Sequence, residues 1–179
     1  FASTIRLGTL ESTRQSEDRL TFSRHYAIHQ YLQGLKETLN SLPTSSLSIE
    51  PGSVLSGVQF HNTDTLKVDI KPPSNIDVTG SYAHGSALHV NPNIDVVITL
   101  PQDFISEKEF QNYGYFDKRA AYVAAVATHL RLSQNLAYSN LYISHEPNDT
   151  LKSNIVIQPS KQVKDVMKRD KNGFIHLHQ

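Results

Sequence analysis

The sequence predicts an α+β domain in which helices pack on a mixed β-sheet and a long helix precedes the sheet. Two segments, near residues 19–43 and 116–130, repeat apolar residues at the spacing of a helix packed on one face. Residues 94–100 are almost uninterrupted aliphatic sequence, as in a strand buried on both faces. A chain of 179 residues is long enough for one compact domain with its own core.

The leading helix is predicted from apolar residues at alternating steps of four and three, namely Ile28, Leu32, Leu35, Leu39 and Leu42. Pro43 ends this pattern because proline cannot continue a helix. Residues 43–57 are rich in Ser, Pro and Gly and predict a connecting loop. We therefore divide the chain into residues 1–57, a leading helix with its loop, and residues 58–179, the main domain.

The main domain is expected to contain short strands around the second helix. One half-buried strand is indicated by apolar residues that alternate with polar ones, Leu66, Val68 and Ile70. A short extended piece at 76–78 leads into Gly80. Further strands are predicted after the second helix, at 141–144, 154–158 and 174–178. The last strand runs into the end of the sequence, so we expect a domain truncated at its C-terminal end and a chain that is part of a longer, multi-domain protein.

Composition restricts the classes of function. Lys and Arg number 17, as do Asp and Glu, so the domain lacks the positive field of an autonomous nucleic-acid binder. One basic cluster, at Lys161, Lys164, Lys168 and Arg169, is a candidate RNA contact, and the alternative is a solvated turn. The absence of Cys excludes disulfides and thiolate metal sites. No apolar run approaches the ~20 residues of a membrane span, so we expect no membrane partner.

The segment most informative about chemistry is a Gly-Ser turn, Gly80 and Ser81, followed after a spacer by Asn93, Ile94 and Asp95. Alternate residues of a strand point to the same side, so side chains 93 and 95 lie together while Ile94 faces the core. This pattern resembles the signature of nucleotidyltransferases such as poly(A) polymerases and CCA-adding enzymes. In those enzymes two acids at such positions, with a third from a neighbouring strand, hold two Mg²⁺ ions. The resemblance implies a nucleotidyltransferase (polymerase-beta-like) fold.

Two of the three carboxylate positions hold amides in this chain. Asn93 stands at the first, Asp95 alone is acidic, and the third position, judged from the strand at 153–157, falls on Asn154. Losing one unit charge ~4 Å from a divalent ion forfeits roughly 4 to 8 kcal/mol of attraction even with a screened protein dielectric. We therefore expect a pseudoenzyme with no catalytic residue, no metal and no cofactor. The alternatives are an ordinary strand-to-helix turn at Gly80 and, for Asp95, a strand-terminal acid satisfied by that turn.

A closer resemblance extends beyond the turn. The segment Pro-Asn-Ile-Asp-Val at 92–96 is followed by Thr-Leu-Pro at 99–101, Tyr-Phe-Asp-Lys-Arg-Ala-Ala-Tyr at 115–122 and Thr-His-Leu at 128–130. Together these motifs resemble the nucleolar RNA-associated protein family, Nrap. The resemblance is strongest from residue 80 to residue 130 and extends to residue 159. Leu100 stands where the family pattern has Met, a minor departure.

Membership of this family would imply a nuclear, nucleolar location and a role in the small-subunit processome, which matures pre-ribosomal RNA and assembles the 40S subunit. Family members are built from tandem nucleotidyltransferase-like units, of which this segment would be the first. The resemblance implies a scaffold rather than an enzyme. Its expected partners are other processome proteins and, in addition, pre-rRNA or a guide RNA.

Two further readings stay open. The domain could be an active template-independent nucleotidyltransferase acting on RNA, with Asp95 assisted by Asp103 or Asp149, or a nucleotide sensor that keeps only the phosphate cradle of the Gly-Ser turn. His176 and His178 share one face of a strand and could pair on a metal. Without an evident third ligand we interpret them as exposed histidines on an edge strand and assign no metal.

Overall fold

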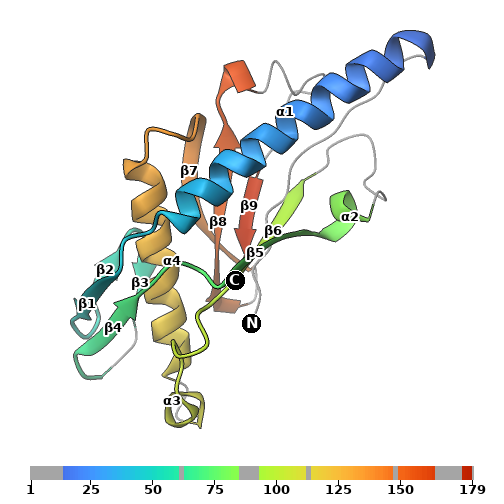
Figure 1. The fold of residues 1–179 in the computed structure, drawn as a ribbon. Coiled ribbons are helices and arrows are strands. Elements are labelled where there is room, and N and C mark those ends of the chain that lie inside the picture. The colour runs from blue at the N-terminus through green and yellow to red at the C-terminus, as the bar shows by residue number, and fades with distance from the viewer. Residues whose placement is uncertain are drawn as a thin grey trace.

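A computed structural model describes residues 14–60, 63–84, 93–111, 114–146, 149–163 and 175–178. In chain order the elements are α1 (Arg14–Asn40), β1 (Ser45–Ile49), β2 (Val54–Leu55), β3 (Val58–Gln59), β4 (Leu66–Ile70), β5 (Asn75–Thr79), α2 (Gly80–Ala83), β6 (Ile94–Thr99), α3 (Glu107–Gln111), α4 (Tyr115–Leu132), β7 (Tyr138–Glu146), β8 (Asp149–Pro159) and β9 (Ile175–His178). The expected α+β class, with a long helix ahead of a mixed sheet, is confirmed (Figure 1).

The main sheet has five strands in the order β5-β6-β9-β8-β7. β6 and β9 run parallel, while the pairs β5–β6, β8–β9 and β7–β8 are antiparallel. One face belongs to the hydrophobic core through alternate aliphatic residues such as Ile94, Val96 and Ile98 of β6. Val97 and Val156 are also buried but lie outside that core cluster, as expected for residues on the opposite face. The sheet therefore has an apolar face and a second face on which the candidate site lies.

Helix α4 is the centre of the core. It contacts β7 and β8 of the main sheet on one side and β3 and β4 on the other, as its position in Figure 1 shows. Burial on several sides explains why its buried residues include alanines, which allow neighbouring elements to approach closely, alongside larger side chains such as Tyr122 and Leu130. Helix α1 adds Leu35 and Leu39 to the same core cluster.

A network of side chains fixes the segment between β6 and α4. The ring of Phe104 packs edge-on against Tyr122 with centroids 5.2 Å apart, and the Tyr122 hydroxyl donates a 3.0 Å hydrogen bond to the carbonyl of Lys71. Lys118 pairs with Glu109 at 2.7 Å and donates to the carbonyl of Phe104 at 3.1 Å. Burial raises the pKa of Glu109, but hydrogen bonds from Lys118 and Ser106 outweigh this effect and hold that pKa below its usual value.

Several predicted elements occur where the sequence placed them. Strands β4, β5 and β6 and helix α4 match the predictions within about two residues, which is the usual uncertainty of element boundaries. Helix α1 begins at Arg14, five residues before the start that periodicity suggested, because its first turns lack the apolar stripe. No described helix is long and apolar enough to cross a membrane.

The loop predicted at 43–57 is wrong. This segment contains β1, which pairs antiparallel with β4 from Ser45 opposite Ile70 to Ile49 opposite Leu66. The abundance of serine hid a period-two pattern in which Leu47 and Ile49 face inward. Because β1 pairs with β4 and α1 shares the core of the sheet, the described side chains on both sides of residue 57 pack in one core.

Strand β9 also corrects an expectation. His176 and His178 were interpreted as exposed histidines on an edge strand, but β9 is the third of five strands and pairs with β6 and β8. The edge interpretation failed because the order of strands in a sheet does not follow their order in the sequence.

Candidate functional site

The Gly-Ser turn lies at the end of β5. Thr79 ends the strand in an extended conformation, and Gly80 then adopts a φ of 72° and opens the single-turn helix α2. The turn is closed by a 3.2 Å hydrogen bond from the His84 amide to the Gly80 carbonyl. A positive φ of this size favours glycine, because other residues place their Cβ too close to the backbone. Ser81 is exposed on the first turn of α2.

Glycine at position 80 is required for a second reason, its contact with Asp95. A Cβ built on Gly80 would overlap Oδ2 of Asp95 and lie 3.0 Å from its Cγ and 3.2 Å from its Cβ. Thr79 and Asp95 are paired in register on β5 and β6, and the Thr79 hydroxyl lies 3.5 Å from the Asp95 carbonyl. The turn and the strand bearing the acid are therefore packed tightly together, with the Asp95 carboxylate against the Cα of Gly80.

The three predicted ligand positions differ in exposure. Asp95 is only 4% exposed and Asn154 only 6%, while Asn93, directly before β6, is half-buried. A carboxylate that receives a metal-bound nucleotide has to face a space that admits the nucleotide. Burial of Asp95 against the turn instead favours the reading in which this acid holds the turn in place.

Asn154 is not on the strand next to Asp95, contrary to the sequence analysis. β9 lies between β6 and β8, and the residue of β8 level with Asp95 is Val156, since both are in register with His176. Two strand spacings and a two-residue offset separate the Cα atoms of Asp95 and Asn154 by about 12 Å. The spacing of residues along the chain could not reveal the intervening strand, because β9 comes last in the sequence.

Strand β9, which neighbours β6 on the side towards β8, carries no acid in register with the site. Positions 176 and 178 of β9 are in register with Asp95 and Val97, and both hold His. Among the residues whose side chains the structure describes, no group of three or more His, Asp and Glu could hold a metal ion. A three-carboxylate cage of the kind found in nucleotidyltransferases is therefore not assembled from the described residues.

The acids invoked for an active enzyme lie at the opposite end of β6. Asp103 follows the end of that strand and forms an exposed ion pair with Lys71, and this hydrogen-bonded Lys71 holds the pKa of Asp103 below its usual value. Asp149 opens β8, whose antiparallel course places its start level with the end of β6. Four residues of β6 alone span about 13 Å, so neither acid is close to Asp95.

Sequence reasoning missed one acid on the same face as Asp95. Asp77 of β5 is in register with Val97, which places it diagonally across from Asp95 at roughly 7 to 8 Å. Its side chain is exposed and accepts a hydrogen bond from the amide of Asn75. The signal was available in the alternation of Asn75, Asp77 and Thr79, but only strand pairing shows that this polar side of β5 faces the same way as Asp95.

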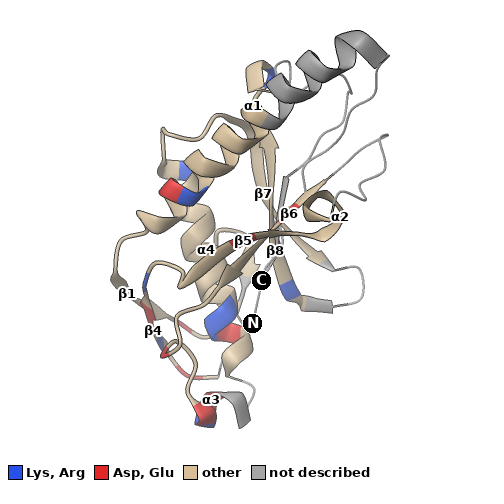
Figure 2. Cartoon of the chain, turned by 45° about the vertical axis from the view of Figure 1, so that its right-hand side comes forward, with Lys and Arg blue, Asp and Glu red and all other residues tan. Residues whose placement is uncertain are grey.

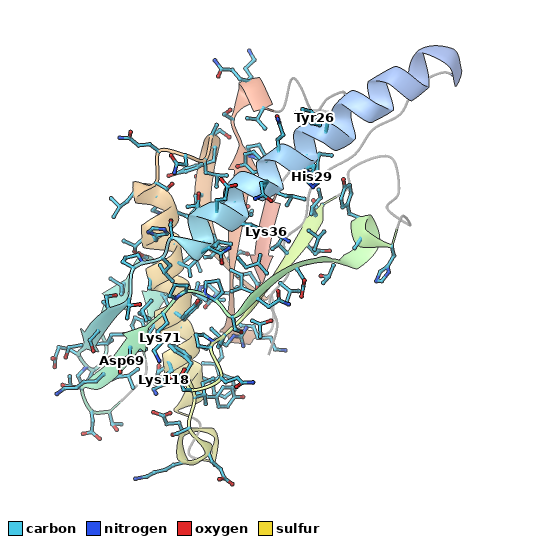
Figure 3. All side chains as sticks on the ribbon, in the orientation of Figure 1. Tyr26, His29, Lys36, Asp69, Lys71 and Lys118 are labelled. Atoms are coloured by element: carbon cyan, nitrogen blue, oxygen red, sulfur yellow. The ribbon has the colours of Figure 1, made fainter. Side chains whose placement is uncertain are left out.

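Among the described residues, charged side chains of both signs occur together at the end of the molecule away from the Gly-Ser turn (Figure 2). In Figure 2 basic and acidic residues are interspersed over β4, α3 and α4. Figure 3 shows Asp69, Lys71 and Lys118 at the end of the molecule away from α2, where they line a polar hollow of about 90 Å³. Of the predicted RNA-contact residues, Lys161 is exposed in the turn after β8. Lys164, Lys168 and Arg169 lie outside the described residues.

The fold and the site together define an α+β domain in which a Gly-Ser turn packs on one buried carboxylate, and in which the other predicted ligand positions are amides. Comparison with known proteins then identifies the family. Residues 33–178 match the family model described as Nrap protein domain 1. The chain belongs to the Nrap family, as the resemblance predicted, and the match to domain 1 agrees with its expected place as the first unit.

Curated relatives carry the name Nucleolar protein 6. The protein from Xenopus laevis is 33% identical over 150 residues, and that from Xenopus tropicalis 34% identical over 156 residues; each alignment covers 80% of this chain and 13% of the relative. The protein from Mus musculus is 35% identical over 89 residues, covering 50% of this chain and 8% of the relative. This chain thus spans about an eighth of the length of the Xenopus relatives. Their names support the expected nucleolar, and hence nuclear, location.

Proposed function

We propose that this domain is a non-catalytic, nucleotidyltransferase-like scaffold in nucleolar ribosome biogenesis. In this proposal it belongs to the small-subunit processome and supports pre-rRNA processing and 40S assembly through contacts with processome proteins and with RNA. The observation that carries the proposal is the Asp95 carboxylate, which is buried against Gly80 and has amides or histidines at the positions where a metal cage needs acids.

The chemistry of nucleotidyl transfer supports this reading. In a two-metal site, two Mg²⁺ ions about 3.5 to 4 Å apart activate the attacking hydroxyl and stabilise the leaving pyrophosphate. Several carboxylates have to hold these ions, because the two ions together carry four positive charges. Asp95 provides one negative charge and Asn93 none. A single buried carboxylate does not balance two divalent ions, and removing it from water without a bound cation requires hydrogen-bond donors, a positive neighbour or protonation instead.

Contacts with RNA are proposed as secondary to contacts with proteins. The formal net charge of zero gives little long-range attraction to phosphate, so the isolated domain would bind RNA weakly and with a shallow dependence on salt. Lys161 is the part of the basic cluster whose exposure is described. Neutralising it together with Lys164 and Lys168 in a gel-shift titration measures how much of any RNA affinity the cluster supplies.

The decisive test replaces Asp95 by Asn in the full-length protein. Asp95→Asn keeps the shape that packs on Gly80 and removes the charge that a metal would need. For a scaffold, pre-rRNA processing in cells carrying this variant proceeds as in wild type at matched expression. Blocked processing, with the variant still folded and incorporated into pre-ribosomal particles, would show that the carboxylate has a chemical role.

An in vitro experiment addresses catalysis directly. Calorimetry with each Mg-nucleotide and a primer-extension assay should detect neither sub-millimolar metal-dependent binding nor product. Among the described side chains, Asp77 is the acid best placed to assist Asp95, since both lie on one face of β5 and β6. If product forms and is lost in Asp77→Asn, the domain is an enzyme that uses a different pair of acids from the family signature.

A further inference from the structure

Pairing of the strands brings an acid and a histidine to adjacent positions in the main sheet. Asp95 of β6 is in register with His176 of β9, and these two strands run parallel. Residues in register on neighbouring strands lie on the same side of a sheet, and the strands are about 4.8 Å apart. Positions 95 and 176 are therefore next to each other on the face that bears the candidate site.

The row of in-register positions across β5, β6, β9 and β8 contains one residue that can carry a positive charge. Thr79 of β5 precedes Asp95 in this row, and Val156 of β8 follows His176. Thr and Val stay neutral, whereas an imidazole has at least one N–H donor whichever nitrogen carries the proton. Asp77 lies diagonally from Asp95, and its charge has the same sign. The row thus places a hydrogen-bond donor beside Asp95 on the side of β9.

The environment of Asp95 requires such a donor. The residue is only 4% exposed, and a carboxylate removed from water is costly unless donors or a positive neighbour compensate it. On one side the carboxylate packs against the Cα of Gly80, a contact that fills space without supplying an N–H or O–H donor. A histidine at the adjacent position of β9 is suited to supply one.

The position of β9 gives this pair of residues a structural role. β9 is four residues long and lies between β6 and β8, so in the described sheet it joins the pair β5–β6 to the pair β8–β7. So short a strand forms few backbone hydrogen bonds, and a register shift of one residue would exchange its two faces. Ile175 or Leu177 would then stand next to Asp95 in place of His176. A polar pair that forms in a single register excludes this alternative.

We propose that the imidazole of His176 donates a hydrogen bond to the carboxylate of Asp95, and that this pair holds β9 in register between the two halves of the main sheet. The acid retained from the nucleotidyltransferase signature is thus an anchor for β9, and a histidine takes the place that a metal ion has in an enzyme. The inference deepens the proposed non-catalytic function and rests on it, since it assigns the Asp95 carboxylate to a partner within the fold.

Hydrogen–deuterium exchange of the full-length protein, followed by mass spectrometry of peptides from β6 and β9, measures how firmly β9 is held. Asp95→Ala and His176→Ala each remove one partner. Each should raise the exchange rate of the β9 amides by about tenfold, the factor that corresponds to 1.4 kcal/mol. The double variant should exchange little faster than either single variant, because the same pair is lost in all three, whereas two independent losses would give roughly a hundredfold.

His178 provides the matched control on the same strand. It is in register with Val97, which has no charge or acceptor in its side chain. The effects of Asp95→Ala and His178→Ala on the exchange rate should therefore multiply, as they do for residues without a shared contact. His176→Gln keeps an N–H donor and should retain part of the protection that His176→Ala loses, but only while Asp95 is present.

Protection of the α4 amides reports whether each variant is folded. If an alanine variant loses that protection, Asp95→Asn and His176→Phe complete the same cycle with side chains of similar size, and the coupling should then be severalfold. The expected result is the same: the double variant exchanges more slowly than the product of the single effects predicts.

Single effects that multiply in the cycle of Asp95 and His176 would overturn the pair. A coupling that disappears when the protein is treated with EDTA would also overturn it, because a bound cation would then join the two residues. The primer-extension assay is independent of both measurements. Product formation in that assay would refute the proposed function, while an absence of coupling refutes only the pair.

Discussion

The contact between the Gly-Ser turn and Asp95 of β6 can be tested by adding a single methyl group. Gly80→Ala places a Cβ where the structure has none, at a residue with a φ of 72° and against the Asp95 carboxylate. Two separate costs follow, one from the backbone conformation and one from the overlap. The left-handed conformation costs a non-glycine residue about 1 to 2 kcal/mol, and overpacking a well-filled site costs about 1 to 3 kcal/mol.

Gly52 provides the control that separates these two costs. It has a φ of 68°, and a Cβ built there would meet nothing within 4 Å. Gly52→Ala should therefore lower the free energy of unfolding by about 1 to 2 kcal/mol, the backbone cost alone. Gly80→Ala should lower it by the same amount plus about 1 to 3 kcal/mol for the overlap.

Urea unfolding followed by circular dichroism measures both variants, together with Asp95→Ala and the double variant Gly80→Ala/Asp95→Ala. Truncating Asp95 removes the Oδ2 and Cγ atoms that the new Cβ would meet. The double variant should therefore be more stable than the sum of the single effects predicts, by about 1 to 3 kcal/mol, the range of coupling for residues in contact. Additivity within about 0.5 kcal/mol, or equal losses for Gly80→Ala and Gly52→Ala, would refute the packed contact.

Three further predictions concern the core and the segment beside α4. Tyr122→Phe should destabilise by about 1 kcal/mol because it removes the hydrogen bond to a backbone carbonyl, whereas Tyr138→Phe, which loses an exposed and longer bond, should cost less than about half of that in the same unfolding assay. Burial raises the pKa of Glu109, but hydrogen bonds outweigh this and hold it low. The contribution of Glu109 to the free energy of unfolding is therefore present above the unfolded pKa near 4.5 and is lost as pH falls through the folded pKa. As pH is lowered from about 7 to about 3, through the range in which carboxylates titrate, the unfolding midpoint should fall less steeply for Glu109→Gln than for wild type. Val123→Asp buries an unpaired carboxylate at a fully buried position of α4 and should prevent folding, while Leu132→Asp, on the same helix at 77% exposure, should leave a soluble folded protein.

Local patterns predicted the elements whose environment is uniform along their length. Strand β6 is buried at nearly every position and appeared as an unbroken aliphatic run, and α4 appeared as an apolar stripe. Strand β1 was missed because serines occupy the outward positions of a short two-stranded ribbon. A composition rich in serine predicts a loop when the partner strand β4 is not known. The strand β1 is therefore determined by its pairing with β4 and not by the propensity of its own residues.

Only those parts of the site that depend on spacing along the chain could be predicted from the sequence. The Gly-Ser turn, Asn93 and Asp95 were identified from spacing, and the structure brings Gly80 and Asp95 into contact. The position of Asn154 and the presence of Asp77 on the same face depend on which strands are neighbours. Insertion of β9 between β6 and β8 separates residues that a simple count of strands would join, and no periodicity in the sequence encodes strand order.

The Gly80–Asp95 contact also explains why a signature motif does not by itself identify an enzyme. In an active nucleotidyltransferase the glycine lets the turn approach a nucleotide and the acid holds metal. Here the same two residues pack against each other, since glycine is the residue whose missing side chain makes space for the carboxylate. Packing therefore requires this pair whether or not catalysis takes place. The residues free of that requirement are the remaining ligand positions, and Asn93 together with the non-acidic positions of β9 supports a scaffold.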